Sequence, residues 1–95
     1  MKFKIYQLGH TNTYWIYLVN DKNGEVYEFD QKIANIIGIS IDKYHSELLQ
    51  FSTDPPHRQY YDKLKTDVVF HKIEEAEAAK NYLETKYGLI LELIS

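Results

Sequence analysis

The sequence contains no cysteine, so disulfide bonds and thiolate metal sites are excluded, and a reducing compartment is favoured. Long apolar runs are also missing, since none approaches the roughly 20 residues that a membrane-spanning helix needs. Met1 leads directly into an alternating strand pattern, without the apolar segment of a signal peptide. We therefore expect a soluble protein located in the cytoplasm, without a membrane partner.

Basic charge is scarce. The formal net charge is −3, and Arg58 is the one arginine among the 11 basic residues. Proteins that bind duplex DNA draw much of their affinity from neutralised phosphates, and no basic patch is visible here to supply it. The charge therefore argues mildly against nucleic acid and leaves a protein partner open.

Signatures of catalysis and of cofactor binding are absent as well. The sequence has no Gly-rich phosphate loop and no nucleophile motif. Dispersed histidines without a short ligand pair are more often surface or hydrogen-bonded residues than metal ligands. The four histidines, His10, His45, His57 and His71, are dispersed in this way. We expect no metal, no cofactor and no enzymatic activity.

A chain of 95 residues is expected to form one domain, residues 1–95, with a single modest core. Its first third predicts a three-stranded antiparallel β-meander. The expected strands are Lys2–Leu8, Tyr14–Val19 and Glu25–Phe29, with a turn at Asn20–Gly24. The second stretch is apolar throughout, which is typical of a central strand. Because side chains alternate between faces, one of Trp15 and Ile16 must face the core.

Two short helices are predicted between Phe29 and Phe51, because apolar residues recur there at helical spacing. The spacing is formed by Ile33, Ala34, Ile36 and Ile37, and then by Ile41, Tyr44, Leu48 and Phe51. We expect Asp30 to cap the first helix and Ser40 to cap the second. Gly38 is expected to end the first helix in a left-handed conformation.

This helical pair resembles a helix-turn-helix, with the small Ala34 where two helices cross and Gly38 in the turn. The resemblance implies a DNA-binding regulator that uses Asp30–Gln50. Glu47 departs from the pattern, which has an apolar residue at that place. The exposed positions of the second helix carry more acid than base, so a helical hairpin packed on a sheet is the simpler interpretation.

The last third predicts a strand–helix–strand unit. Asp67–Lys72 is expected to be a short strand, Glu74–Tyr87 a helix that Gly88 ends, and Leu89–Ile94 a returning strand. Such a unit makes a right-handed crossover between parallel strands. The inward helix face is expected to be Ala76, Ala79, Leu83 and Tyr87. The predicted fold class is therefore α+β: an antiparallel β-meander, a helical pair and a C-terminal β-α-β unit on one sheet of about five strands.

Aromatic residues are in excess, with nine tyrosines in the chain. We expect the core to include Tyr17, Tyr44 and Tyr82. A loop with two prolines follows Phe51, and its stiff backbone can present side chains to a partner. Tyrosine and arginine are enriched at binding hot spots. The predicted partner-binding residues in this loop are His57, Arg58, Tyr60 and Tyr61. The alternative is that the two loop tyrosines pack against the sheet.

These observations predict a small, acidic, non-enzymatic binding protein that occludes or tethers a protein partner. The chain is rich in amino acids with AT-rich codons, which favours a low-GC bacterium or one of its phages. Inhibition of a host protein by a phage or mobile-element product is the expected mode of action. The alternative is a helix-turn-helix DNA-binding regulator. A third hypothesis is a binder of a small ligand or nucleotide at a dimer interface, with Arg58 as its cation, so a homo-oligomer is left open.

Overall fold

The computed structural model describes residues 1–52 and 67–94, the last six of these by their backbone alone. Two long strands, β1 (Lys2–Gln7) and β2 (Tyr14–Val19), pair antiparallel over their whole length, with Phe3 opposite Leu18. A short third strand, β3 (Val26–Tyr27), pairs with the other edge of β2. The meander expected from the sequence is confirmed, with β2 as its central strand.

The turn between β2 and β3 has the local chemistry that its sequence predicts. The side-chain oxygens of Asn20 and Asn23 each accept a backbone N–H from the residue two places on, at 3.0 and 2.9 Å. Gly24 has a φ of 72°, a left-handed conformation that glycine adopts without a steric penalty. The strand after the turn is shorter than the five residues predicted, because only Val26 and Tyr27 pair with β2.

The helical pair consists of α1 (Asp30–Ile37) and α2 (Ile41–Leu49). Gly38 ends α1 with a φ of 82°, and its N–H bonds to the carbonyl of Ala34, as the left-handed cap requires. The Ser40 side chain accepts the N–H of Lys43 at 3.1 Å and caps α2. Both of these predictions are confirmed.

The prediction that Asp30 caps α1 is wrong. Phe29 occupies the cap position in an extended conformation, and its own side chain makes no capping bond. Asp30 is the first residue of the helix, and its carboxylate is buried and accepts the N–H of Val68 at 2.8 Å. The Asp30 carboxylate therefore bonds to the N–H of Val68, which is distant in the sequence, and not to the N–H groups of its own helix.

After residues 53–66, the chain passes through Val68, Val69 and Phe70, all buried. Only Phe70 pairs with the sheet, through two reciprocal backbone hydrogen bonds of 2.9 Å with Tyr14. The pairing is a single antiparallel bridge, so the predicted strand at Asp67–Lys72 is wrong. The buried valines pack into the core without forming a ladder.

The last element is one long helix, α4 (Ile73–Ile94), which continues through Gly88. The predicted strand Leu89–Ile94 and the right-handed crossover between parallel strands are therefore wrong. A glycine inside a helix costs only about 1 kcal/mol relative to alanine, and a helix that is already several turns long propagates more easily than it starts. The predicted inward face is confirmed, because its four members are all buried: Ala76, Ala79, Leu83 and Tyr87.

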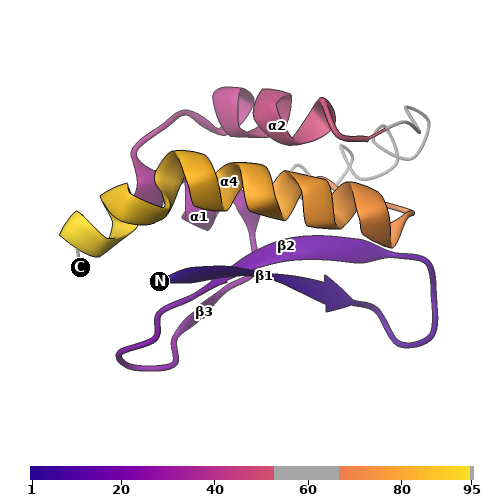
Figure 1. Ribbon diagram of the computed structural model, residues 1–95, viewed down its shortest axis with the longest axis horizontal. Helices are drawn as coiled ribbons and strands as arrows, with labels where there is room; N and C mark the ends of the chain where they lie inside the picture. Colours follow the sequence, from indigo (N-terminus) through magenta and orange to yellow (C-terminus); the bar gives the residue numbers. More distant parts are fainter. Residues whose placement is uncertain (53–66, 95) are drawn as a thin grey trace.

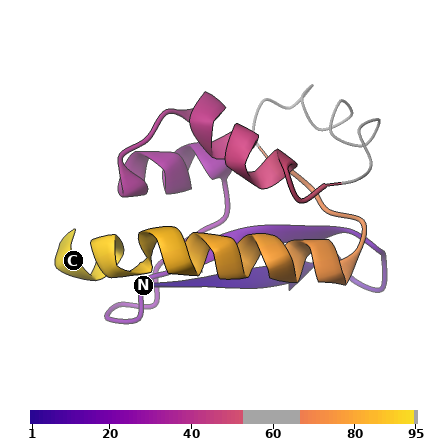
Figure 2. The ribbon, with the colours of Figure 1, turned by 45° about the horizontal axis from the view of Figure 1, so that its top comes forward.

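All three described helices lie on one side of the sheet (Figure 1). Helix α4 packs on β1 and β2, whereas α1 packs on β2, β3 and α4. Helix α2 packs on α1, on the side away from the sheet (Figure 2). The described residues thus form a mixed α+β domain with a three-stranded antiparallel sheet instead of the five strands predicted.

The hydrophobic core lies between the sheet and these helices. Phe3, Ile16 and Leu18 face it from the sheet and are at most 2% exposed. Of the pair Trp15 and Ile16, Ile16 is therefore the inward residue. The helices contribute a matching set of buried side chains, Ile33, Ala34, Ile37, Tyr44, Leu48, Ala76, Ala79, Leu83 and Tyr87.

Candidate functional site

The predicted partner-binding residues His57, Arg58, Tyr60 and Tyr61 lie outside the described residues. Where the structure describes the chain, a different cluster of aromatic side chains stands out. It lies on the face of the sheet that no described helix covers (Figure 1).

This cluster follows from the alternation of side chains along β1 and β2. Phe3 on β1 and Ile16 and Leu18 on β2 are buried against the helices. Because side chains alternate between the two faces of a sheet, Tyr6 on β1 and Trp15 and Tyr17 on β2 point to the opposite face. The strand register places Tyr6 directly opposite Trp15. Their ring centroids lie 5.7 Å apart, and the ring of Tyr17 meets the Tyr6 ring edge-on at 6.5 Å. Both separations are typical of interacting aromatic pairs.

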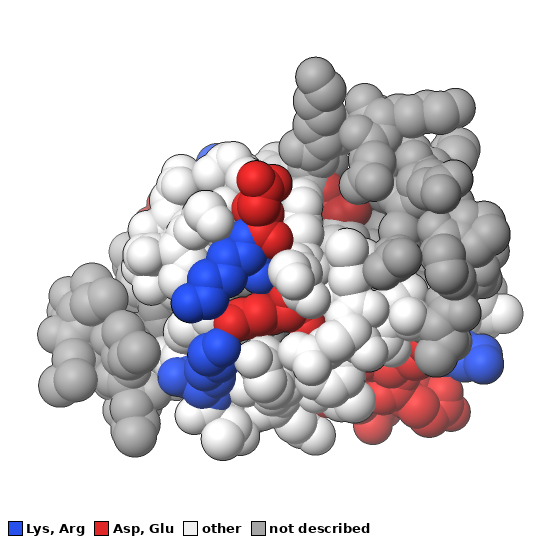
Figure 3. Space-filling model, turned by 90° about the horizontal axis from the view of Figure 1, so that it is seen from above, with Lys and Arg blue, Asp and Glu red and all other residues white. Residues whose placement is uncertain are grey.

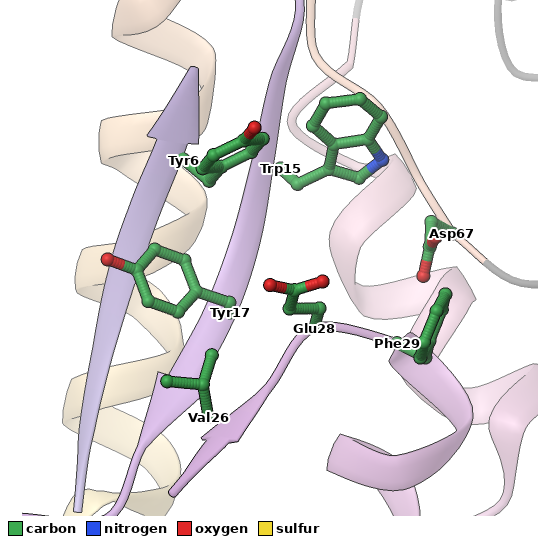
Figure 4. A pocket seen from close by; sticks show the side chains of 7 residues that line it. All are labelled: Tyr6, Trp15, Tyr17, Val26, Glu28, Phe29 and Asp67. Carbon is green, nitrogen blue, oxygen red and sulfur yellow. The ribbon is translucent and has the colours of Figure 1, made fainter. Parts of the chain in front are cut away.

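The rings border a pocket of about 370 Å³. Figure 4 shows its seven lining side chains, Tyr6, Trp15, Tyr17, Val26, Glu28, Phe29 and Asp67. Tyr6, Val26 and Phe29 are nearly half exposed, at 49%, 45% and 46%. We call the five apolar and aromatic members, Tyr6, Trp15, Tyr17, Val26 and Phe29, the aromatic face.

Two carboxylates complete the pocket. The carboxylate of Glu28 lies among the rings, between Tyr17 on one side and Phe29 on the other (Figure 4). Asp67 lies beside Phe29 (Figure 4), and its Oδ1 accepts the backbone N–H of Asp30 at 3.0 Å, which holds the carboxylate in place. No basic side chain is among the described residues that line the pocket.

Behind the pocket, Asp30 joins three parts of the chain. Its Oδ2 accepts the N–H of Val68 at 2.8 Å and lies 3.2 Å from Nε2 of His45, on α2. Burial raises the pKa of Asp30 to about 6, and the contacts from His45 and Val68 offset only part of this effect. The neighbouring Tyr44 is also buried, and its hydroxyl has no hydrogen-bond partner among the described residues. Burial raises the pKa of Tyr44 as well.

Glu47, the residue that departs from the helix-turn-helix pattern, is explained by its partners on α4. Its Oε2 accepts the hydroxyl of Tyr87 at 2.6 Å, and its Oε1 forms an ion pair with Lys86. Burial alone raises the pKa of Glu47, but the hydrogen bonds from Lys86 and Tyr87 hold it below its usual value. Glu47 therefore fastens α2 to α4 and does not serve as a packing residue.

The helical side of the molecule carries no continuous basic surface in its described part. Figure 3 shows acidic and basic side chains interleaved across this face. On α2, the exposed positions include Asp42 and Lys43, while Glu47 is paired with Lys86. Gly38 and Ser40 form a short turn between α1 and α2, but the described residues do not form the positive face that duplex DNA attracts.

The tyrosines expected in the core separate into different environments. Tyr44 is fully buried, as predicted. Tyr17 is only half-buried and borders the pocket, so its assignment to the core is wrong. Tyr82 is also half-buried, and its ring lies 5.3 Å from the Phe51 ring.

Histidine and carboxylate side chains do not gather into a metal-binding group in the described part of the chain. His45 contacts Asp30, and Nδ1 of His71 lies 3.0 Å from the carbonyl oxygen of Asn12. Among the described helices, none is long and apolar enough to cross a membrane.

Comparisons with protein-family models, curated proteins and solved structures find no match. The candidate site therefore rests on its geometry alone.

Proposed function

We propose that the chain is a small, non-enzymatic binding protein whose protein partner docks on the aromatic face. The observation that carries this proposal is a cluster of aromatic side chains on the side of the sheet without a described helix. Tyrosine and tryptophan are enriched at binding hot spots, because they bury a large area for few rotatable bonds. A cluster of this kind on a small protein is typical of an interaction site.

Occlusion of a host protein is the mode of action that we propose for this surface. It suits a chain of 95 residues with a net charge of −3, in which the candidate site is an open pocket on a sheet. His57, Arg58, Tyr60 and Tyr61 remain predicted contact residues. They precede Asp67 of the pocket in the sequence, so a partner that touches both is compatible with the proposal.

Site-specific photo-crosslinking tests the proposal. A photoreactive phenylalanine replaces Tyr6, which is half exposed on the aromatic face, in cells that produce the protein. The matched control places it at Glu77, an exposed position on α4. We expect position 6, and not position 77, to form an adduct with a discrete protein. Excess unlabelled protein should remove this adduct, whereas excess Trp15→Ser protein should not. Identical adducts from both positions, or none from position 6, would show that the aromatic face is not the docking surface.

A DNA-binding regulator is the second candidate, because Gly38 and Ser40 form the turn and cap that the helix-turn-helix resemblance requires. The interleaved charges of the helical side argue against it. A specific, salt-dependent gel shift at nanomolar protein concentration would favour this candidate over a protein partner.

The third candidate, a binder of a small ligand or nucleotide, is compatible with the size of the pocket, since ligand sites begin at about 300 Å³. The pocket presents Glu28 and Asp67, however, and two carboxylates repel a phosphate. Arg58, the cation predicted for such a ligand, is outside the described residues. The described lining of the pocket therefore favours a positively charged ligand over a negatively charged one.

A further inference from the structure

We infer that the pocket of the aromatic face takes a lysine side chain of the partner protein, with its ammonium group placed beside Glu28. This inference rests on the proposed function and specifies the chemistry of the docked group. It follows from three properties of the pocket: aromatic walls, two carboxylates in its lining, and an apolar flank.

The aromatic walls favour a cation. The face of an aromatic ring carries negative potential, so an ammonium group within about 6 Å of the ring centroid is attracted to it, most strongly by tryptophan. Tyr6, Trp15, Tyr17 and Phe29 all border the pocket. Three of the rings lie within 6.5 Å of a neighbouring ring, so one ammonium group can contact more than one of them.

The carboxylates reinforce this preference. The Glu28 carboxylate lies among the rings (Figure 4). Among the described residues, the ion pairs join other side chains and do not include Glu28. Asp67 adds a second negative charge, and its position is fixed by the N–H of Asp30. Two lysines lie near the pocket without lining it: Lys4 stands opposite Tyr17 in the strand register, and Nζ of Lys32 lies 6.0 Å from the centroid of the Phe29 ring. The two carboxylates, in contrast, belong to the lining itself. The net charge at the pocket is therefore negative.

The apolar flank selects lysine over a bare ammonium ion. Val26 lies beside the rings and provides a surface for the four methylene groups of a lysine stem. A cavity of about 370 Å³ holds one such side chain. Single-stranded nucleic acid is disfavoured because its phosphates would approach Glu28 and Asp67. Two-fold pairing with a second copy is disfavoured because it would bring identical carboxylates together.

The test uses Trp15 as its reporter, since it is the only tryptophan in the chain. Three capped pentapeptides, Gly-Ser-X-Ser-Gly, are titrated into the full-length protein, where X is lysine, trimethyl-lysine or norleucine. Tryptophan fluorescence and the NMR signal of the indole N–H follow binding. We expect both cationic peptides to bind at least about fivefold more tightly than the norleucine peptide, whose side chain is similar but neutral.

A matched pair of variants locates the effect. Glu28→Gln should weaken binding of the lysine peptide about fivefold and leave the norleucine peptide unchanged, whereas Glu77→Gln should change neither. Both side chains are exposed, so both variants are expected to fold, and the thermal unfolding curve checks this.

Equal binding of the lysine and norleucine peptides would overturn the inference, because the pocket would then select apolar shape and not charge. Tighter binding of an oligothymidine than of the lysine peptide would overturn it in favour of a stacking surface. Concentration-dependent dimerisation that Trp15→Ser abolishes would overturn it in favour of self-association. If the position 6 crosslink persists while no cationic peptide binds, the proposed function stands and the lysine assignment fails.

Discussion

Replacing Asp30 by asparagine is expected to remove most of the dependence of stability on pH between about pH 4 and 7. Asp30 is 2% exposed, and burial raises the pKa of its carboxyl from 3.8 to about 6. One pKa unit corresponds to about 1.4 kcal/mol, so the difference of roughly two units between folded and unfolded chain corresponds to about 3 kcal/mol.

The sign follows from proton uptake. Between the two pKa values the folded chain binds a proton at Asp30 and the unfolded chain does not, so folding is favoured by low pH in this window. The contribution is complete below about pH 4 and is lost as the pH rises through about 6. The other groups that face Asp30 are His45 and Tyr44 from α2 and Asp67 from the segment before α4.

Urea unfolding at half-unit pH steps, followed by circular dichroism, measures this effect. The carboxamide of Asp30→Asn can still accept the Val68 N–H, and His45 is 21% exposed, so water can solvate it when the carboxylate is absent. We expect the variant to be at least as stable as the parent at pH 7, with a flat profile down to about pH 4. The control Asp21→Asn, in the exposed turn after β2, should keep the parent profile.

The opposite result would refute this reasoning. If Asp30→Asn lost more than about 2 kcal/mol at pH 7 while the parent gained stability between pH 4 and 6, the carboxylate would act as the charged partner of His45. Below about pH 4 the profile is not informative about Asp30. Carboxylates whose pKa is lowered, such as Glu47, then lose their contribution as they are protonated.

Three further predictions concern stability. Tyr87→Phe should cost about 1.5–3 kcal/mol in urea unfolding at pH 7, because the Glu47 carboxylate loses its 2.6 Å hydrogen bond; an unchanged midpoint would show that the bond contributes nothing. Gly88→Ala should stabilise the protein by about 0.5–1 kcal/mol, because an added Cβ meets no atom within 4 Å, and a loss of thermal stability would argue against a helix there. Ile16→Ala should cost about 2–5 kcal/mol and Trp15→Ala much less, and equal melting temperatures for these two variants would contradict the strand orientation.

The β-meander and the helical pair could be predicted from the sequence because their signals are local. A turn with Asn23 and Gly24, a cap such as Ser40 and a terminator such as Gly38 act on residues at most four places away. The inward face of α4 is equally local, since its buried residues recur every three or four positions. Local chemistry therefore predicted the order of the elements from β1 to α2 and the inward face of α4, but not the segment between these two helices.

The end of the chain could not be predicted in the same way. The stretch Leu89–Ile94 is almost entirely apolar, and such a run has no periodicity that separates a strand from a buried helix. The prediction that the helix ends and a strand follows depended on Gly88, because glycine commonly follows the last turn of a helix. Its cost inside a helix is small, however, and α4 continues through it.

The buried polar residues depend on partners that are remote in the sequence. Asp30 bonds to Val68, 38 positions away, and Glu47 bonds to Tyr87, 40 positions away. The sequence analysis interpreted each residue from its immediate neighbours: Asp30 as the cap of a helix, and Glu47 as a departure from the helix-turn-helix pattern. A carboxylate that replaces an expected apolar residue is itself a signal, because burial of a charge requires a partner somewhere in the fold.

The aromatic face escaped prediction because β2 is apolar on both sides. In Tyr14–Val19 the inward and outward positions look alike, so Tyr17 could be assigned to the core. The neighbouring strand resolves the ambiguity, since the alternation of β1 turns Phe3 inward and the register then places Tyr6 and Trp15 outward together. The inward residues of the sheet are accounted for by the core that they form with the helices. The outward rings add little to that core, and the exposed apolar area that they create favours association. The proposed docking of a partner on the aromatic face would account for their presence.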